Sequence, residues 1–388
     1  MSRPCWPRPP NSWGRLPGEG RATRFRIRGG GRVRRYGRTM SEGSYIGSSI
    51  AAAEIVAGFA GRTILVVGDA IADLWVYGVP RRISREAPVL ILEYERQVIM
   101  PGGAAHCARS IAALGARAML ASPVGDDDWG RALIERLRAT GVELLPGNVR
   151  QGWTTPLKAR FVAAPRAAPA QQVLRLDVVP DKGLASGVET PGPDRCGEEL
   201  EGALAAAVER ADAIVLADYG LSDLTPNLWP RIRRLAGNRP VVVDSRHRLL
   251  AYRGATVATP NTEELAEAWG SSLETYDDIT RAGRAILAKG EFRALVVTMG
   301  PDGMAVLLPG RSPLHLPAVD PAAVYDVTGA GDTVAAVLAL GLGSGLDVPA
   351  AARLANLAGS LAVRKPGTEP VTQAELRDAA AREGMQVG

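Results

Sequence analysis

Asp326-Val327-Thr328-Gly329-Ala330-Gly331-Asp332-Thr333 is the stretch that decides the fold class; it lies between a strand-like segment, 322–325, and an apolar run that predicts a helix from Thr333 to about Leu342. Glycines at the start of a helix let backbone N–H groups converge on an anion, and the helix dipole favours negative charge there. Asp332 follows the glycines directly, so its carboxylate is placed to take the proton of a hydroxyl that attacks a phosphoryl group. The stretch therefore predicts a phosphate-binding loop, with an aspartate cap on a glycine-rich turn as the alternative.

Around this stretch, short apolar runs alternate with helical patterns from Thr63 onward, which is typical of βαβ units on a mostly parallel sheet. Glycines end two of the predicted helices, 104–114 and 129–140. The predicted strands are 64–67, 119–122, 214–216, 241–243, 256–258, 295–298 and 305–308. Two other stretches, 75–100 and 154–179, alternate in hydropathy and contain Pro and Gly, so they predict a small accessory sheet with a loop at 163–170.

Composition excludes several classes of protein. The chain has 388 residues, of which 46% are hydrophobic and 22% charged, so it can bury a large core and is neither disordered nor collagen-like. No run approaches the roughly 18 apolar residues of a transmembrane helix, so no membrane span is expected. Cys5, Cys107 and Cys196 form no CxxC pair and indicate a reducing compartment, which predicts a cytoplasmic protein without structural zinc. The acidic run 126–128 precedes a predicted helix and is interpreted as a solvent-facing loop.

The basic net charge of +5 belongs to the first part of the chain. Residues 1–39 contain eleven arginines and one acid, Glu19, whereas the remainder has more acidic than basic residues. The remainder therefore gives no electrostatic reason to expect nucleic-acid binding. We expect 1–39 to be disordered, 40–61 to be a linker, and 62–388 to form one folded domain. For 1–39, three interpretations stay open: an extended reading frame with the true start at Met40, an arm that contacts polyanions, or an organellar presequence.

Two further segments suit nucleotide phosphates. Residues 259–264 follow a predicted strand and open a helix that ends at Gly270. Asn261 and Glu264 have the spacing of a helix-capping box, and the functional alternative is a polar pair that reaches magnesium-associated water. Residues 298–303 form a tight turn between two predicted strands. A hairpin explains this turn, and proximity to phosphates would be a second use of the same glycines. No Gly-x-x-x-x-Gly-Lys-Ser/Thr motif occurs, so a P-loop is excluded.

In order and approximate spacing, these motifs resemble the ribokinase-like (PfkB) family of carbohydrate kinases over about 63–376. The general resemblance rests on 68–69, Asp73, 102–103, 261–264, 298–303 and 329–332. Within the family, the chain is most similar to the D-glycero-β-D-manno-heptose 7-phosphate kinases. The segments that carry this closer similarity are 82–89, 101–105, 171–177, 252–256 and 324–328.

The resemblance implies a three-layer α/β sandwich with a β lid over the sugar, formed by the strands within 75–100 and 154–179. It implies ATP and Mg²⁺ as cofactors, a sugar phosphate as acceptor, a homodimer through the lid, and Asp332 as catalytic base beside an anion hole of Gly329, Ala330 and Gly331. The nucleotide-binding residues that it implies are Asn261, Thr262, Glu263, Glu264, Thr298, Gly300, Gly303 and Asn356, with Mg²⁺ held by Asn261 and Glu264 through water. The candidate substrate-binding residues are Asp69, Asp73, Arg82, Glu86, Gly102, Gly103, His106, Lys158, Arg160 and Arg175. A monovalent cation, K⁺, near Asp326 and Thr328 is left open.

Three positions depart from the heptose kinase pattern, and they bear on which sugar binds. His106 stands where the family usually has Asn, and imidazole differs from an amide in size and titration. Asp244-Ser245-Arg246 stands where the heptose enzymes have Asp-Pro-Lys, and Arg does not replace Lys geometrically. Asp218-Tyr219 is not followed by the usual Lys-Gly.

The expected activity is ATP-dependent phosphorylation of the anomeric hydroxyl of heptose 7-phosphate. The alternatives are a kinase of another sugar or sugar phosphate, and a non-catalytic regulator that binds a sugar or nucleotide. The pathway, whether for envelope polysaccharide or for a secreted product, is left open. No second catalytic domain is expected after the helix predicted near Gln373.

Overall fold

A computed structural model describes residues 50–165, 169–180, 198–320 and 324–387, all of which lie in the unit Gly47–Gly388. The arginine-rich segment 1–39 and residues 322–323 of the strand-like segment lie outside the described residues.

A sheet of nine strands forms the centre of the described unit. Its strands run parallel from β14 to β7, and β15 and β16 continue it antiparallel. The inner strands are buried on both faces, as expected for a parallel sheet covered by helices. The order across the sheet is β16 (Leu314–Leu316), β15 (Met304–Leu307), β14 (Ala294–Thr298), β13 (Val257–Ala258), β12 (Val241–Ser245), β11 (Ala213–Asp218), β2 (Thr63–Gly68), β5 (Arg117–Ala121) and β7 (Glu143–Leu144).

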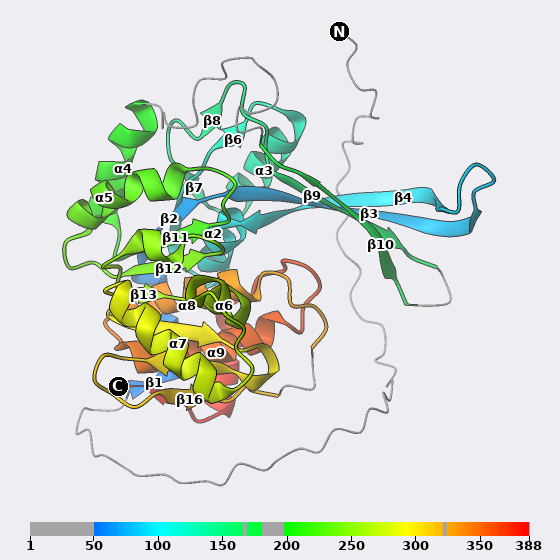
Figure 1. The fold of residues 1–388 in the computed structure, drawn as a ribbon. Helices are drawn as coiled ribbons and strands as arrows, with labels where there is room; N and C mark the ends of the chain where they lie inside the picture. Colours follow the sequence, from blue (N-terminus) through cyan, green and yellow to red (C-terminus); the bar gives the residue numbers. More distant parts are fainter. Residues whose placement is uncertain (1–49, 166–168, 181–197, 321–323, 388) are drawn as a thin grey trace, which may run out of the picture. The chain divides into compact units, whose positions relative to one another are not determined.

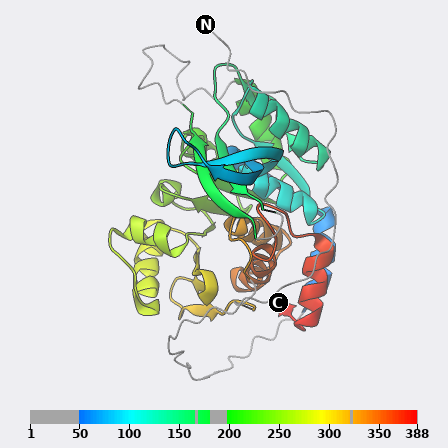
Figure 2. The ribbon, with the colours of Figure 1, turned by 90° about the vertical axis from the view of Figure 1, so that its right-hand side faces the viewer.

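Helices cover both faces of this sheet and make three layers (Figures 1 and 2). Successive strand residues point to opposite faces, so Ile64 and Val66 enter one core while Leu65 and Val67 enter the other. The first core contains α1 (Ala52–Ala57), α2 (Ala104–Ala113), α3 (Asp128–Ala139), α8 (Ala330–Gly343), α9 (Val348–Ala362) and α10 (Gln373–Arg382). The second contains α4 (Glu198–Arg210), α5 (Leu224–Ala236), α6 (Thr262–Trp269) and α7 (Tyr276–Lys289).

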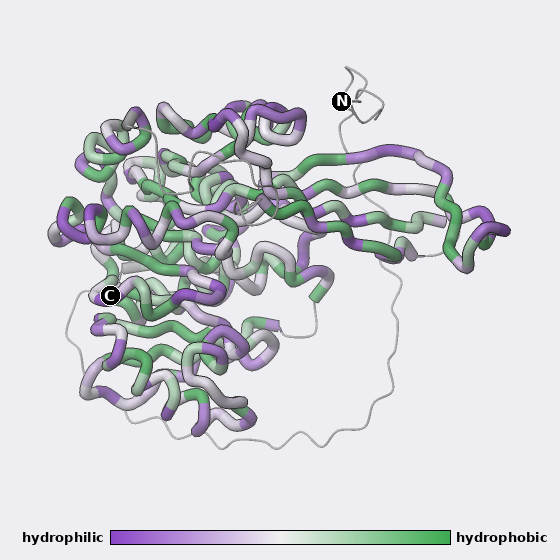
Figure 3. Tube along the Cα trace, turned by 45° about the horizontal axis from the view of Figure 1, so that its top comes forward, coloured by the Kyte–Doolittle hydropathy of each residue, from purple (hydrophilic) through white to green (hydrophobic). Residues whose placement is uncertain are grey.

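Four strands form a separate sheet, which we call the lid. Their order is β10 (Gln171–Val178), β9 (Leu157–Ala163), β3 (Ala70–Ile83) and β4 (Leu90–Gly103), with the central pair β9 and β3 parallel. Leu74, Ile99 and Leu157 pack at its base, beside Trp129 of α3, whereas β10 is exposed along most of its length. Hydrophobic and hydrophilic residues are mixed along the lid strands and in the loop between β3 and β4 (Figure 3). The predicted accessory sheet is confirmed, although β3 begins at Ala70 instead of near 75.

The two ends of the described chain meet. β1 (Ile50–Ala51) pairs antiparallel with β17 (Gln386–Val387), and α1 packs against α10. Residues 50–61, predicted as part of a linker, form α1 and a 3₁₀ turn (Gly58–Gly61) and bury Val56 and Phe59 completely. The folded domain therefore extends at least to residue 50. A further short pair joins β6 (Val124–Gly125) to β8 (Val149–Arg150).

Within the described residues, no helix is both long and apolar enough to cross a membrane.

Candidate active site

The glycine-rich loop forms a cradle at the start of α8. Gly329 is the N-cap of this helix with φ +76°, a conformation that favours glycine, and a Cβ there would lie 2.5 Å from Nε2 of His106. Asp326 fixes the loop, because its carboxylate accepts the N–H of Thr328 and of Gly367, both at 2.9 Å. The N–H groups of Tyr325 and Asp326 donate to Val363, so the strand predicted over 322–325 is not formed at its described end. At the start of α8, the N–H of Ala330 donates to the carbonyl of Val327 at 3.3 Å. The next amides have no partner inside the helix and suit an anion.

Asp332 lies on the first turn of α8, buried with 4% of its surface exposed. The hydroxyl of Tyr219, which follows β11, donates to Oδ1 of Asp332 at 2.8 Å. Burial raises the pKa of Asp332 to about 7, whereas the Tyr219 hydrogen bond and the charge of Lys158 lower it. The carboxyl can therefore gain and lose a proton near neutral pH, which is what a general base requires.

The lid supplies charged groups that face this carboxyl. Asp73 on β3 and Lys158 on β9 are register partners, and Arg160 lies two residues beyond Lys158. Nη1 of Arg160 donates to Oδ1 of Asp73 at 2.6 Å, and both side chains are buried. The Lys158 ammonium lies 5.2 Å from the centre of the Tyr219 ring, and burial lowers its pKa. Tyr219 therefore contacts both a lid cation and the Asp332 carboxyl.

Gly102 and Gly103 allow β4 to pass close to these groups. A Cβ on Gly102 would lie 2.5 Å from Oδ2 of Asp73, and one on Gly103, at φ +57°, would lie 2.5 Å from the carbonyl oxygen of Asp69. The two glycines therefore lie against Asp73 and Asp69, and their predicted contact with a sugar stays a prediction.

Asp69, predicted to hold sugar, has both oxygens engaged by one loop. They accept the N–H of Tyr219 at 3.0 Å, the N–H of Leu221 at 3.1 Å and the hydroxyl of Ser222. Burial raises the pKa of Asp69 to about 6, and these donors oppose the rise. Asp69 therefore fixes the loop that carries Tyr219, and its predicted contact with a sugar stays a prediction.

The predicted nucleotide segment begins α6 with a complete capping box. Oδ1 of Asn261 accepts the N–H of Glu264 at 2.8 Å, and Oε2 of Glu264 accepts the N–H of Asn261 at 2.9 Å. Thr262 and Glu263 complete its first turn. The charge of Glu264 raises the pKa of Asp332 and of Asp244, so Glu264 lies near both of these carboxyls. The capping interpretation is thus confirmed, and the segment still borders the site.

The other nucleotide candidates lie beyond this segment. Thr298 ends β14 and bridges Asn261, and Gly300 begins the 3₁₀ turn between β14 and β15. Gly303, with φ +86°, would place a Cβ 2.0 Å from the carbonyl oxygen of Leu316, so the hairpin itself requires this glycine. Nδ2 of Asn356 on α9 donates to the carbonyl of Pro317 at 2.7 Å.

The chemistry of these groups fits Mg²⁺ only in part. Among the described residues, no cluster of three or more His, Cys, Asp or Glu side chains could hold a metal ion alone. Mg²⁺ usually keeps several waters and binds through one or two carboxylates together with substrate phosphates. A site at Glu264 that is completed by nucleotide phosphates and water agrees with that pattern.

Four further predicted substrate residues have different surroundings, and their contact with a sugar stays a prediction. Arg82 and Glu86 are exposed at the far end of the β3–β4 hairpin; Arg82 is about 30 Å along β3 from Asp73, at roughly 3.3 Å per residue. Arg175 on β10 is in register with Arg160, but its fork is bound to Asp177.

His106 is the fourth, and it lies directly behind the glycine cradle. Its ring is 1% exposed and lies behind Gly329, with Nδ1 lacking a hydrogen-bond partner among the described residues. Burial first, and then the charge of Arg109, lower the pKa of His106 to about 3, so the ring is neutral.

Sequence reasoning missed two groups of the site, Tyr219 and Asp244. Oδ2 of Asp244 lies 3.8 Å from the Cβ position of Gly331, and burial raises its pKa. Both residues stand at the carboxyl ends of neighbouring parallel strands, β11 and β12, as Asp69 does beyond β2. Ligands of open α/β sheets bind outside these ends, and that rule was the available signal.

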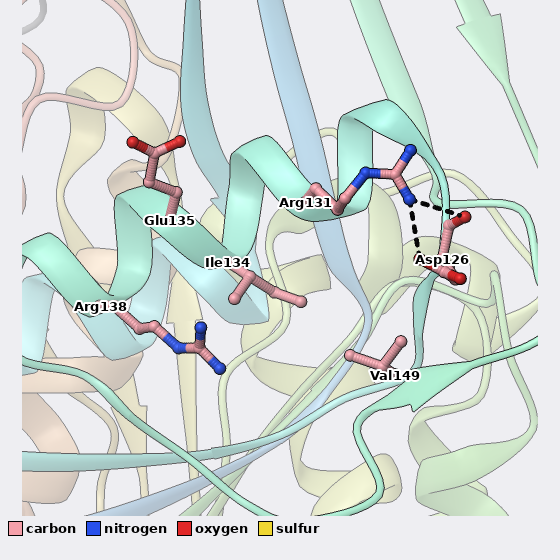
Figure 4. A pocket seen from close by; sticks show the side chains of 7 residues that line it. Asp126, Arg131, Ile134, Glu135, Arg138 and Val149 are labelled. Atoms are coloured by element: carbon pink, nitrogen blue, oxygen red, sulfur yellow. Dashed lines mark hydrogen bonds and ion pairs between the residues drawn. The ribbon is translucent and has the colours of Figure 1, made fainter.

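A separate cavity of 410 Å³ lies between α3 and β8, away from these groups (Figure 4). Arg131 of α3 pairs there with Asp126, whose other oxygen accepts from Gln151. Asp127 is the N-cap of α3 and accepts the N–H of Gly130 at 2.7 Å. The interpretation of the acidic run as a loop before a helix is therefore confirmed.

Known proteins share the sequence of this domain. The model of the pfkB family carbohydrate kinases matches residues 62–166 and 195–374. The bifunctional protein HldE of Caulobacter vibrioides is 41% identical over 334 residues, which cover 84% of this chain and 65% of that protein. The HldE of Geobacter metallireducens is 37% identical over 315 residues, covering 80% and 61%. The chain thus spans just under two thirds of the length of these relatives.

Solved structures share the fold. Arabidopsis thaliana ribokinase, complexed with ribose and ATP, matches with a TM-score of 0.65 and 21% identity over 82% of this chain and 98% of that one. Escherichia coli phosphofructokinase-2 in complex with potassium matches with a TM-score of 0.64 and 19% identity over 84% and 99%. The predicted ribokinase-like α/β sandwich is confirmed.

Proposed function

The chain belongs to the pfkB family of carbohydrate kinases, and from that premise we propose that it transfers the γ-phosphoryl group of ATP to the anomeric hydroxyl of D-glycero-β-D-manno-heptose 7-phosphate. The products would be ADP and the heptose 1,7-bisphosphate. The observation that carries the proposal is the Asp332 carboxyl beside the glycine cradle, with a pKa near neutrality and a lid lysine opposite.

Each residue of the site has a defined task in this reaction. Asp332 takes the proton of the anomeric hydroxyl as that oxygen attacks phosphorus. The backbone amides at Gly329, Ala330 and Gly331 receive the migrating phosphoryl group, and Lys158 balances its negative charge from the lid. Catalysis of phosphoryl transfer rests mainly on such positioning and charge stabilisation.

ATP and Mg²⁺ would occupy the side of the site formed by α6. Mg²⁺ would neutralise the nucleotide phosphates, held through water by Glu264 and Asn261. Asp326 already accepts two N–H groups, so a K⁺ ion near Asp326 and Thr328 would take main-chain oxygens as ligands. Chelation of Mg²⁺ should abolish ADP release, and replacement of K⁺ by a larger organic cation tests the second ion.

The lid offers two arginines for the 7-phosphate. Arg160 and Arg175 lie side by side in neighbouring strands, two residues or about 7 Å beyond the Lys158 row. Guanidinium forks pair well with phosphate oxygens. Asp73 and Asp177 bind these arginines in the described structure, so a phosphate would have to share them. That pairing is the observation that favours the second candidate, a kinase of an unphosphorylated sugar.

A substrate panel separates the two candidates. ADP release would be measured with heptose 7-phosphate, the dephosphorylated heptose, ribose and fructose 6-phosphate, each with the Asp332→Asn protein as blank. We expect heptose 7-phosphate to give the highest kcat/KM. Turnover of an unphosphorylated sugar without turnover of heptose 7-phosphate would reject the first proposal, and no ADP release with any sugar would favour a non-catalytic regulator.

We also propose that two copies associate through the lid. Large apolar side chains stand exposed on β10, with Leu174 57% and Leu176 53% exposed. Exposed apolar patches of this kind often mark interfaces between subunits. Arg82 and Glu86, which lie far from this chain's own site, would then be placed against the second copy.

A further inference from the structure

Hydrogen bonds from several elements hold the backbone at Tyr219. Its N–H donates to Oδ2 of Asp69 at 3.0 Å. The preceding residue, Asp218, is buried and accepts hydrogen bonds from Arg248, from Tyr252 and from Ser245. The backbone on which the phenol ring stands is therefore held between the ends of β2, β11 and β12.

We propose that Tyr219 is the positioning residue of the catalytic base: its hydroxyl holds one oxygen of Asp332, so that the other oxygen faces the hydroxyl of the sugar. The proposal rests on the kinase function argued above and adds a residue to it. Its geometric basis is the 2.8 Å hydrogen bond to Oδ1 and the Lys158 ammonium, which lies 5.2 Å from the centre of the phenol ring.

The direction of this hydrogen bond follows from chemistry. A carboxylate that is to accept a substrate proton has none to give, so the phenol must donate. Burial, together with the charges of Asp332 and Asp244, raises the pKa of Tyr219 well above its usual range. The phenol therefore keeps its proton throughout the pH range in which Asp332 titrates.

Groups from every packed element act on Asp332. Lys158 of β9 favours its charged form, whereas Asp73 of β3 and Glu264 of α6 disfavour it. Asp244 of β12 and Cys107 of α2 also lie near Asp332, because the charge of Asp332 raises the pKa of each of them. Tyr219 is the group that touches the carboxyl directly and opposes its burial. Without it, the pKa of Asp332 should rise, and the carboxyl should lose its orientation.

The test is Tyr219→Phe, with Tyr276→Phe as matched control. Tyr276 is a second tyrosine, at the start of α7, and its ring packs against His315 and contacts no group of the site. In Tyr219→Phe we expect kcat to fall roughly tenfold to hundredfold, as for loss of a hydrogen bond to a charged group. KM for ATP and sugar should stay within about twofold. The acidic limb of the kcat–pH profile should move to higher pH in this variant alone.

A second readout does not depend on which sugar is phosphorylated. Infrared difference spectra between each protein and its Asp332→Asn counterpart follow the carboxyl band as pH changes. We expect the midpoint to rise in Tyr219→Phe and to stay unchanged in Tyr276→Phe. If kcat changed less than about twofold and the midpoint did not move, Tyr219 would only fill space beside Asp332 and would not position it. If heptose 7-phosphate is not a substrate, the function proposal fails, and the test proceeds with the accepted sugar or with the infrared titration alone.

Discussion

The floor and the roof of the site are built by different means. The floor, formed by the α8 cradle, Asp332 and Tyr219, is set by the ends of strands that are buried on both faces. The roof, formed by Asp73, Lys158 and Arg160, stands on a lid whose outer strand is exposed. Backbone hydrogen bonds fix the floor, whereas strand register and one ion pair fix the roof. This difference leads us to expect that the rate of phosphoryl transfer depends mainly on the floor, and the choice of sugar mainly on the roof.

The largest effect is expected at Asp332. Asp332→Asn removes the proton acceptor but keeps the shape, so kcat should fall by about a thousandfold, within the usual range for a general base. Coupled-enzyme detection of ADP measures it. Asp347→Asn, which alters the N-cap of α9, is the matched control. A fall in Asp332→Asn no larger than in the control would contradict the assignment of the base.

The same variant should be more stable than the parent at high pH. The pKa of Asp332 is about 7 in the folded protein and 3.8 ordinarily, so between these pH values the folded state binds more protons at this position than the unfolded state. Stability from this group therefore falls as pH rises through that window and stays low above it. Asp332→Asn should raise Tm near pH 8 and leave it almost unchanged near pH 4, as measured by calorimetry.

The second effect tests the geometry of the floor. Gly329→Ala introduces a Cβ at positive φ and 2.5 Å from His106. We expect a loss of about 1–3 kcal/mol of unfolding free energy from the backbone conformation, and a larger loss of kcat than of stability because the cradle shifts. Gly345→Ala, at φ +92° with nothing within 4 Å, isolates the backbone contribution. Equal kcat in the two variants would show that the cradle is not critical.

The third effect tests the roof. Lys158→Met keeps the apolar stem and removes the charge, and because Lys158 lowers the pKa of Asp332, the acidic limb of the kcat–pH profile should move upward. We expect kcat to fall roughly tenfold, as for loss of one partly buried charge contact. Lys289→Met, at the last turn of α7, is the control. An unchanged profile would remove Lys158 from the reacting centre.

The smallest effect on turnover, and the largest on assembly, is expected on the outer lid. Leu174→Ser with Leu176→Ser should shift the protein from dimer to monomer in sedimentation while kcat changes by less than about twofold, because both side chains are exposed and neither is a candidate site residue. Trp269→Ser removes a comparably exposed apolar group on α6. A dimer that survives the double change would place the interface elsewhere.

The body was predictable because its signals are local. Buried strands such as 64–67 are short apolar runs, and the loop at 326–333 carries its own chemistry in its order of glycines and aspartates. The lid was predicted as a sheet from its alternating pattern, but its start at Ala70 was not, since β3 continues directly from the end of β2. The capping box of α6 was likewise visible from spacing alone.

The roles of Asp69, His106 and Tyr219 were not predictable, because each depends on a partner far away in sequence. Asp69 binds a loop 150 residues later, and His106 lies against Gly329. No periodic pattern encodes which strand ends become neighbours. Arg82 and Glu86 lie in a segment that resembles the family motif. The pairing of β3 with β4 nevertheless places them at the far end of a long hairpin, away from Asp332.

The pairing of β1 with β17 has a consequence for synthesis on the ribosome. Val56 and Phe59 are covered by a core that includes Leu376, Ala379 and Ala380, so their partners are translated more than 300 residues later. At roughly 5–20 residues per second, the nascent chain carries these two apolar side chains uncovered for on the order of tens of seconds. The packing of α1 on α10 is therefore completed only when the last helix has emerged.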